Sequence, residues 1–293
     1  MSDLAVVTLP TAPAPPGHAM RRFVGHRLAV IGLVVIGVLA VSAAFASWLA
    51  PYSPDDIDIV NRYAPPLSQG HLLGSDDLGR DVLTRLMYAG QVSLSVGVAA
   101  MAVTVIVGFA IGAFAAYLGG WVDVVLMRLT DTMLCFPSVF LLLFVAAFVT
   151  PSLASIALMI GLTCWMELAR VVYAQIRVLK SADFVAAARM VGAPAWRIIL
   201  RQILPNVMAP ILVAGTLNTA NAILLESYIS FLGYGIQPPQ ASWGNMLTNA
   251  QSDFLVDPWL AVMPGLAITL AVTSFNFIGD GLRDALDPKM QRR

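Results

Sequence analysis

Charged residues are absent from five long stretches of this chain, and these stretches predict its secondary structure. They hold 27 residues (28–54), 37 residues (86–122), 35 residues (132–166), 24 residues (202–225) and 22 residues (258–279). A helix of about 20 apolar residues crosses the hydrocarbon core of a bilayer. Because backbone polar groups in lipid must be paired within their own segment, the stretches are predicted to be helices.

Six membrane spans follow from this pattern, at 28–50, 92–118, 123–149, 153–173, 206–230 and 259–279. Gly119-Gly120 separates the second span from the third, as expected of a tight turn. The nearly uncharged window 231–251 is not counted as a span, because its glycines and prolines would interrupt a helix repeatedly. A loop or a short re-entrant element fits this window better.

The composition agrees with an all-α membrane protein. Only 12% of the residues are charged, whereas soluble domains carry roughly 25%. The expected organisation is a disordered, proline-rich tail over 1–20, then a first span with an extracytoplasmic loop over 21–91. A five-helix core over 92–280 and a cytoplasmic tail over 281–293 follow.

The basic residues predict the orientation of the bundle. Six spans place both termini on one side of the membrane, and that side then carries 14 of the 17 Lys and Arg residues. Cytoplasmic loops are enriched in Lys and Arg, so both termini are predicted to be cytoplasmic. Residues 51–91 then form a long extracytoplasmic loop, and residues 174–205 form a long cytoplasmic one.

The cytoplasmic loop is predicted to hold two short helices separated by a glycine. Ser181 can cap the first helix, and Asp183 complements its positive end. Gly192 suits the left-handed position that follows the helix. Pro194 is placed at the start of the second helix, which runs towards Pro205 at the entry to the fifth span.

The first of these helices is expected to expose apolar side chains beside a basic one. The apolar residues are Phe184, Val185, Met190 and Val191, and the basic residue is Arg189. A groove on a partner protein would stabilise such a helix, and so would lipid headgroups. The residues by themselves favour neither.

This loop resembles the EAA loop of ABC importer permeases, whose pattern is Glu-Ala-Ala, three residues, glycine, and a spacer ending in Leu-Pro. Ala187-Ala188, Gly192 and Leu204-Pro205 match it, while Ala186 replaces the glutamate. In that family the helix enters a cleft on an ATPase subunit. The resemblance implies an ATPase-docking surface made of Asp183, Phe184, Ala187, Ala188, Arg189, Gly192, Ala193 and Arg197.

Three further segments resemble the dipeptide, oligopeptide and nickel importer branch of this family. They are residues 71–81 (HLLGSDDLGRD), 231–244 (FLGYGIQPPQASWG) and 279–288 (GDGLRDALDP). The best match is the second, C-type permease subunit, which has the type I importer permease fold.

The resemblance implies an inner-membrane subunit that works with a second permease, two ABC ATPases and an extracytoplasmic binding protein. Short peptides are the expected solute. Nickel, glutathione and sugars are alternatives within the same importer type.

Charged residues near the spans are candidates for structural or transport roles, because a charge at the bilayer centre costs at least about 2.5–3.5 kcal/mol. Arg128 with Asp131, and Glu167 with Arg170, have the i, i+3 spacing of pairs that neutralise themselves. Both pairs are placed near cytoplasmic helix ends and are expected to be structural.

Glu226 has no such local partner. It is placed near the outer end of the fifth span, where it could line the translocation path or an outer gate with Ser230 and Phe231. It is also the one plausible lone candidate for proton or ion coupling. An ion-coupled secondary transporter is therefore the alternative function.

No enzymatic site is predicted, since the three histidines lie outside the spans and no nucleophile–base set is present. The chain has no Gly-x-x-x-x-Gly-Lys-Ser/Thr phosphate loop. We therefore expect ATP and Mg to bind to partner ATPases, and we expect this chain to bind no cofactor. His71 with Asp76, Asp77 and Asp81 does not assemble a transition-metal set. The glycines beside these acids favour a turn stabilised by Asp side chains.

Overall fold

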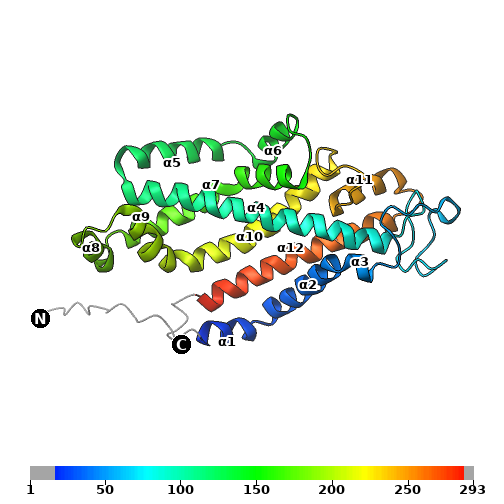
Figure 1. Ribbon diagram of the computed structural model, residues 1–293, viewed down its shortest axis with the longest axis horizontal. Coiled ribbons are helices and arrows are strands. Elements are labelled where there is room, and N and C mark those ends of the chain that lie inside the picture. Colours follow the sequence, from blue (N-terminus) through cyan, green and yellow to red (C-terminus); the bar gives the residue numbers. More distant parts are fainter. Residues whose placement is uncertain (1–16, 287–293) are drawn as a thin grey trace, which may run out of the picture.

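The computed structural model describes residues 17–286, and helices are the regular elements within this range. In chain order these are α1 (Gly17–Gly25), α2 (Arg27–Ala44), α3 (Ala46–Leu49), the 3-10 turn η1 (Ile59–Asn61), α4 (Val82–Leu118), α5 (Gly120–Leu134), α6 (Ser138–Ala146), α7 (Leu153–Leu179), α8 (Asp183–Met190), α9 (Ala195–Ile198), the π-helical turn η2 (Ile199–Ile203), α10 (Leu204–Phe231), α11 (Trp243–Asp253) and α12 (Trp259–Leu286). The long helices lie side by side along the long axis (Figure 1). The short helices α1, α8 and α9 lie at one end, while α11 and the loop before α4 lie at the other.

Five helical segments are long and apolar enough to cross a membrane, namely α2, α4, α7, the continuous segment Ala195–Phe231, and α12. They confirm the all-α membrane fold and five of the predicted spans. α4 begins at Val82 rather than at residue 92, because Asp81 caps it. The Asp81 carboxylate accepts a hydrogen bond from the Thr84 N–H at 2.7 Å.

The third predicted span, 123–149, is not one straight helix. It consists of α5 and α6, which are bent by 87° at the break between Leu134 and Ser138. Pro137 occupies the N-cap of α6, where it has no N–H to continue the hydrogen bonds of α5. The residue before a proline also avoids the helical region, so Cys135-Phe136-Pro137 forms the corner.

The fifth span has no separate entry at Pro205. The segment α9–η2–α10 is continuous from Ala195 to Phe231, and Pro205 lies in the first turn of α10. The π-helical turn η2 lies directly before α10, so the regular i to i−4 hydrogen-bond pattern is already interrupted where Pro205 lacks an N–H. The second helix of the cytoplasmic loop is therefore part of the span.

Close contact between α4 and α7 depends on glycines. A Cβ at Gly108 would lie 2.9 Å from the Trp165 carbonyl oxygen, and a Cβ at Gly161 would lie 2.5 Å from the Val103 Cβ. Small residues let helix backbones approach closely in membranes, where van der Waals packing drives association. α4 and α7 thus make the most extensive helix–helix contact of the described bundle.

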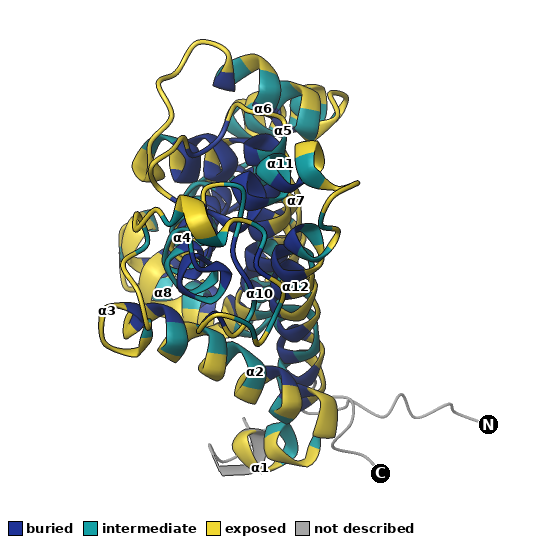
Figure 2. Ribbon diagram, turned by 90° about the vertical axis from the view of Figure 1, so that its right-hand side faces the viewer, coloured by how far each residue is buried: buried dark blue, intermediate teal, exposed yellow. Residues whose placement is uncertain are grey.

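The surface of the bundle is largely apolar. Figure 2 shows exposed residues along the outer faces of α1 and α2, with buried residues where the long helices meet. Val34 and Val38 on α2 and Phe140 and Phe144 on α6 are each more than half exposed. Apolar surface of this extent is typical of contact with lipid or with another membrane subunit.

Two predicted boundaries change. The predicted tail 1–20 lies outside the described residues as far as residue 16, but residues 17–20 belong to α1, so its end was set too late. α12 continues to Leu286, beyond the predicted limit of the core at residue 280, and residues 287–293 lie outside the described range.

Candidate functional site

The loop between α7 and α10 contains the predicted helix and its glycine stop. α8 ends at Met190, and Gly192 follows with a φ of 78°. The Ala193 N–H donates to the Ala188 carbonyl at 3.1 Å, and the Gly192 N–H donates to the Arg189 carbonyl at 2.9 Å. These two bonds make a Schellman motif, which satisfies carbonyls at the helix end. The predicted left-handed position of Gly192 after the helix is confirmed.

The start of α8 differs from the prediction. Ala182 is the N-cap and makes no side-chain capping bond. The Ser181 hydroxyl donates instead to the Val178 carbonyl at 3.0 Å. The cap predicted at Ser181 is wrong, because the turn that ends α7 places this hydroxyl beside a carbonyl of α7.

The α8–α9 segment is anchored to the bundle by apolar contacts. Val185 is fully buried and belongs to one core cluster with Ile198 and Ile203, together with Tyr117 of α4 and Ile176 of α7. The prediction that Val185 is exposed is therefore wrong. The periodicity of a short helix does not reveal that its inner face rests on the ends of α4 and α7.

Arg189 also binds to the bundle. Its guanidinium carbon lies 5.0 Å from the centre of the Tyr117 ring, and its Nε donates to the Tyr117 hydroxyl at 3.3 Å. Cation–π contacts of this kind hold an arginine against an aromatic face. Tyr117 thus connects the last turn of α8 to α4.

The other predicted docking residues divide by position. Ala188 and Ala193 are half-buried and pack against the same cluster. The exposed surface of the segment contains Asp183, Phe184, Ala187, Met190, Val191, Gly192 and Arg197. Met190 and Val191 are 84% and 88% exposed, so an apolar surface projects from a rigidly anchored loop at the end of the molecule (Figure 1).

Glu226 is fully buried where α10 meets α4 and α11. Its carboxylate accepts hydrogen bonds from the Ser93 hydroxyl of α4 at 2.9 Å and from the Ser230 hydroxyl at 2.8 Å. The Ser93 oxygen in turn accepts from the Trp243 N–H of α11 at 3.2 Å. Among the described residues Glu226 takes part in no ion pair, which agrees with the prediction that it has no local counter-charge. Its partners are hydroxyl groups that the sequence did not reveal, one on a distant helix and one on the next turn of α10.

The burial of Glu226 affects the prediction that it lines an outer gate with Ser230 and Phe231. Ser230 is buried beside Glu226, and its oxygen accepts the Ile236 N–H at 3.3 Å, while Phe231 is half-buried. The three residues hold the loop after α10 against the bundle. In this conformation the Glu226 carboxylate is enclosed by protein and not exposed to a path.

The charge pairs differ from the local pairs that the spacing predicted. Arg170 of α7 forms an ion pair with Asp131 of α5, and its Nη2 donates to the Asp131 carboxylate. Among residues 17–286, Arg128 and Glu167 take part in no ion pair. The pair between helices forms because α5 and α7 pack side by side, which spacing along the chain does not indicate.

A cavity of about 440 Å³ lies where the corner between α5 and α6 faces α7 and α10. Glu167 and Cys164 of α7 and Asn218 and Asn221 of α10 are among its lining residues. Sequence reasoning missed both asparagines. The signal that could have found them is a pair of amides in the middle of an otherwise apolar span.

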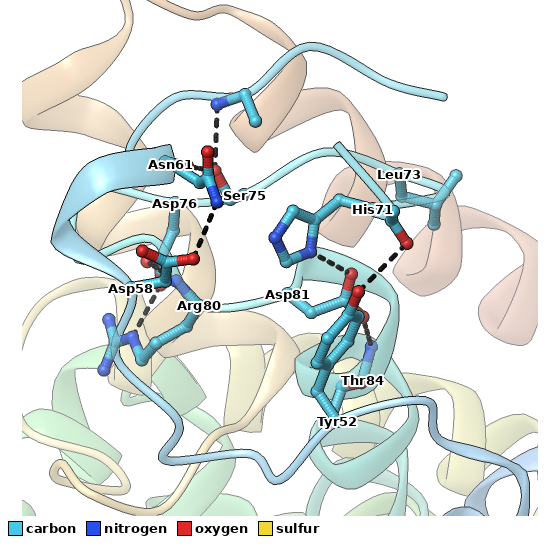
Figure 3. A network of polar contacts seen from close by, with 12 residues as sticks. Tyr52, Asp58, Asn61, His71, Leu73, Ser75, Asp76, Arg80, Asp81 and Thr84 are labelled. Atoms are coloured by element: carbon cyan, nitrogen blue, oxygen red, sulfur yellow. Dashed lines mark hydrogen bonds and ion pairs between the residues drawn. The ribbon is translucent and has the colours of Figure 1, made fainter. Parts of the chain in front are cut away.

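The acidic side chains of the loop before α4 form hydrogen bonds and ion pairs mainly with residues of the same loop. Figure 3 shows His71 pointing at Asp81, with 2.9 Å between His71 Nδ1 and the carboxylate. The Asp81 carboxylate also caps α4 through Thr84. The Tyr52 ring lies against the imidazole, with ring centres 4.9 Å apart.

The neighbouring turn is built on Asp76. Its carboxylate accepts the backbone N–H groups of Leu78 and Arg80, both at 2.9 Å, and pairs with the Arg80 Nε at 2.8 Å. Gly74 and Gly79 have positive φ angles of 85° and 79°. The predicted turn stabilised by an Asp side chain is confirmed.

Two family models match the chain. Residues 108–292 match the family described as binding-protein-dependent transport system inner membrane component. Residues 17–66 match the N-terminal transmembrane domain of oligopeptide transport permease C.

Full-length relatives agree with these matches. The chain is 38% identical over 272 residues to the oligopeptide transport system permease protein OppC of Haemophilus influenzae, covering 92% of this chain and 88% of the relative. It is 38% identical over 281 residues to the dipeptide transport system permease protein DppC of Alkalihalophilus pseudofirmus, covering 96% and 92%. The chain therefore belongs to the family of binding-protein-dependent transport system inner membrane components, as a multi-pass ABC permease of the oligopeptide and dipeptide type.

Proposed function

We propose that this chain is one of two permease subunits of an ATP-driven importer of short peptides. An extracytoplasmic binding protein would deliver the peptide to a path between the two permeases. Two ATPase subunits would bind ATP and Mg and dock on the α8–α9 segment, so that this chain itself needs no cofactor and hydrolyses nothing. The names of the relatives support peptides as the solute.

This proposal rests on the way the α8–α9 segment is anchored on one face and exposed on the other. Its inner face is fixed to α4 and α7 through Val185 and Tyr117, while Phe184, Met190 and Val191 are exposed. A rigidly anchored segment can transmit force to the bundle, and exposed apolar residues mark a contact with another protein or with the membrane. Binding of nucleotide by that partner would bias a bundle with two access states.

The orientation that follows from the basic residues supports the same assembly. Both termini and the α8–α9 segment would face the cytoplasm of a cell with an inner membrane, where ATP is available. The short helix α1 and the C-terminal end of α12 lie at the same end of the molecule as α8 (Figure 1).

A pull-down of the tagged chain from membranes in mild detergent tests the proposal. We expect to recover a second permease and ATPase subunits, identified by mass spectrometry. Phe184→Asp should remove the ATPases and keep the second permease, because a buried charge would disrupt the docking surface. Val24→Asp is the matched control, since Val24 is an exposed apolar residue on α1 at the same end.

Recovery of a stable chain without ATPases would contradict the proposal. Uptake that survives ATP depletion but collapses with the proton gradient would favour the secondary transporter instead. The two functions therefore differ in both partners and energy source.

A further inference from the structure

Glu167, Asn218 and Asn221 lie in the middle parts of two long helices, α7 and α10. Glu167 is near the midpoint of α7, and both asparagines are in the middle part of α10. At a rise of 1.5 Å per residue, each lies at least roughly 15 Å from either end of its helix. α7 continues to Leu179, beyond the predicted end of the fourth span at residue 173, so Glu167 is not near the end of the helix itself.

Glu167 forms no ion pair with any of residues 17–286. Arg170, one turn further along α7, pairs with Asp131 instead. Within the described range, no hydrogen bond or ion pair involves the Glu167 side chain, and both Glu167 and Asn221 are exposed. Asn218 donates its amide N–H to the Ala214 carbonyl at 2.9 Å, which leaves its side-chain oxygen available.

A carboxylate in a membrane-spanning segment is costly against lipid tails. Charged residues within membrane helices face a bundle interior or a water-filled cavity, and they mark pathways for solutes. The corner at Pro137 turns α6 away from α5 and opens the cavity beside these three residues. Its volume of about 440 Å³ falls within the roughly 300–1,000 Å³ of small-molecule sites.

We propose that this cavity is a subsite of the peptide path, in which Glu167 binds the N-terminal ammonium group and Asn218 and Asn221 hydrogen-bond the peptide backbone. This inference rests on the proposed function and adds a recognition chemistry to it. Every short peptide with a free N-terminus carries an ammonium group and backbone amides. One carboxylate and two amides therefore recognise peptides of many sequences, because charge-assisted hydrogen bonds do not depend on the peptide's side chains.

Cys164 offers a direct reporter of this cavity. It lies three residues before Glu167 on α7 and lines the same cavity. In the assembled transporter, with the exposed Cys135 replaced by serine, we would measure how fast Cys164 reacts with two methanethiosulfonates. One carries a trimethylammonium group and the other a sulfonate. The ratio of their rates, normalised to a small thiol in solution, reports the local charge independently of the thiol's own reactivity.

We expect Cys164 to favour the cationic reagent, and Glu167→Gln to lower the rate ratio roughly fivefold, because a carboxylate several ångströms away acts strongly at low dielectric. Asp55→Asn is the matched control, since it removes one exposed carboxylate from the loop before α4. Trialanine should slow the reaction in the unmodified chain and not in Glu167→Gln. N-acetylated trialanine should slow it less.

A rate ratio that Glu167→Gln leaves unchanged would overturn the inference. So would a cysteine closed to both reagents and unaffected by trialanine, which would mean that a partner helix covers the cavity. ATP-driven uptake of trialanine in the same vesicles separates the two proposals. If trialanine is not taken up but Cys164 still prefers the cationic reagent, the peptide function is overturned. If trialanine is taken up but Cys164 shows no preference, only this subsite is overturned.

Discussion

At the scale of single residues, backbone geometry decides the role of Gly192. Its φ of 78° lies in the left-handed region, and nothing lies within 4 Å of a Cβ placed there. Gly192→Val is therefore strained by the backbone alone, at a cost of roughly 1–2 kcal/mol. We expect loss of the α8 stop and at least a severalfold lower rate of ATP-driven peptide uptake in proteoliposomes.

Gly192→Asn is the matched control for this change, because asparagine tolerates the left-handed conformation. It should retain most of the uptake. Equal uptake by the valine and asparagine variants would show that the helix stop does not matter for coupling.

The two glutamates of the long helices differ in burial, and this difference predicts their effects on stability. Glu226→Ala leaves the buried hydroxyls of Ser93 and Ser230 without their acceptor, at roughly 1–3 kcal/mol for each unsatisfied group. Glu226→Gln keeps an acceptor oxygen and should cost less. The loss of stability in both variants can be measured by thermal unfolding in detergent, with tryptophan fluorescence as the signal.

Glu167→Ala provides the comparison, because this exposed carboxylate makes no hydrogen bond in the described chain. Its unfolding midpoint should stay close to that of the unmodified protein. A similar loss of stability at both positions would contradict the structural role assigned to Glu226.

At the scale of helices, the α4–α7 contact depends on the absence of side chains. A Cβ at Gly112 would clash with the Ala169 carbonyl oxygen of α7. Gly112→Ala should therefore lower the free energy of unfolding by roughly 1–3 kcal/mol through overpacking. Chemical unfolding of the purified chain in mixed micelles is a suitable measurement.

Gly265 of α12 is the matched control, since nothing lies within 4 Å of its Cβ position. Gly265→Ala should be neutral or slightly stabilising, because alanine is the better helix former. If both alanines had the same effect, helix propensity and not packing would explain the result.

At the scale of the whole molecule, the two ends of the bundle should face different compartments. With Cys135 and Cys164 replaced, Val60→Cys in the loop before α4 should react with a membrane-impermeant maleimide in intact spheroplasts. Ser181→Cys beside α8 should react only after permeabilisation. Val60 is 92% exposed, and Ser181 is exposed, so access to the compartment limits each reaction. The reverse pattern would overturn the orientation inferred from the basic residues.

The sequence alone determined the features that depend on neighbouring residues. The length of the uncharged stretches predicted the long helices, because the polar groups of a lipid-exposed backbone must form hydrogen bonds within their own segment. Gly192 and the Asp76 turn were predictable for a similar reason, since a left-handed position and an Asp-capped turn are local properties. The match to ABC permeases also followed from short linear motifs.

Only the tertiary structure decided which distant groups meet. It paired Asp131 with Arg170, buried Val185 against α4 and α7, and gave Glu226 a hydroxyl partner on α4. It also bent the third span at Pro137, and it placed Glu167 of α7 and the asparagines of α10 around one cavity. These contacts depend on how helices pack, and helix packing joins residues whose separation along the chain carries no signal of their proximity.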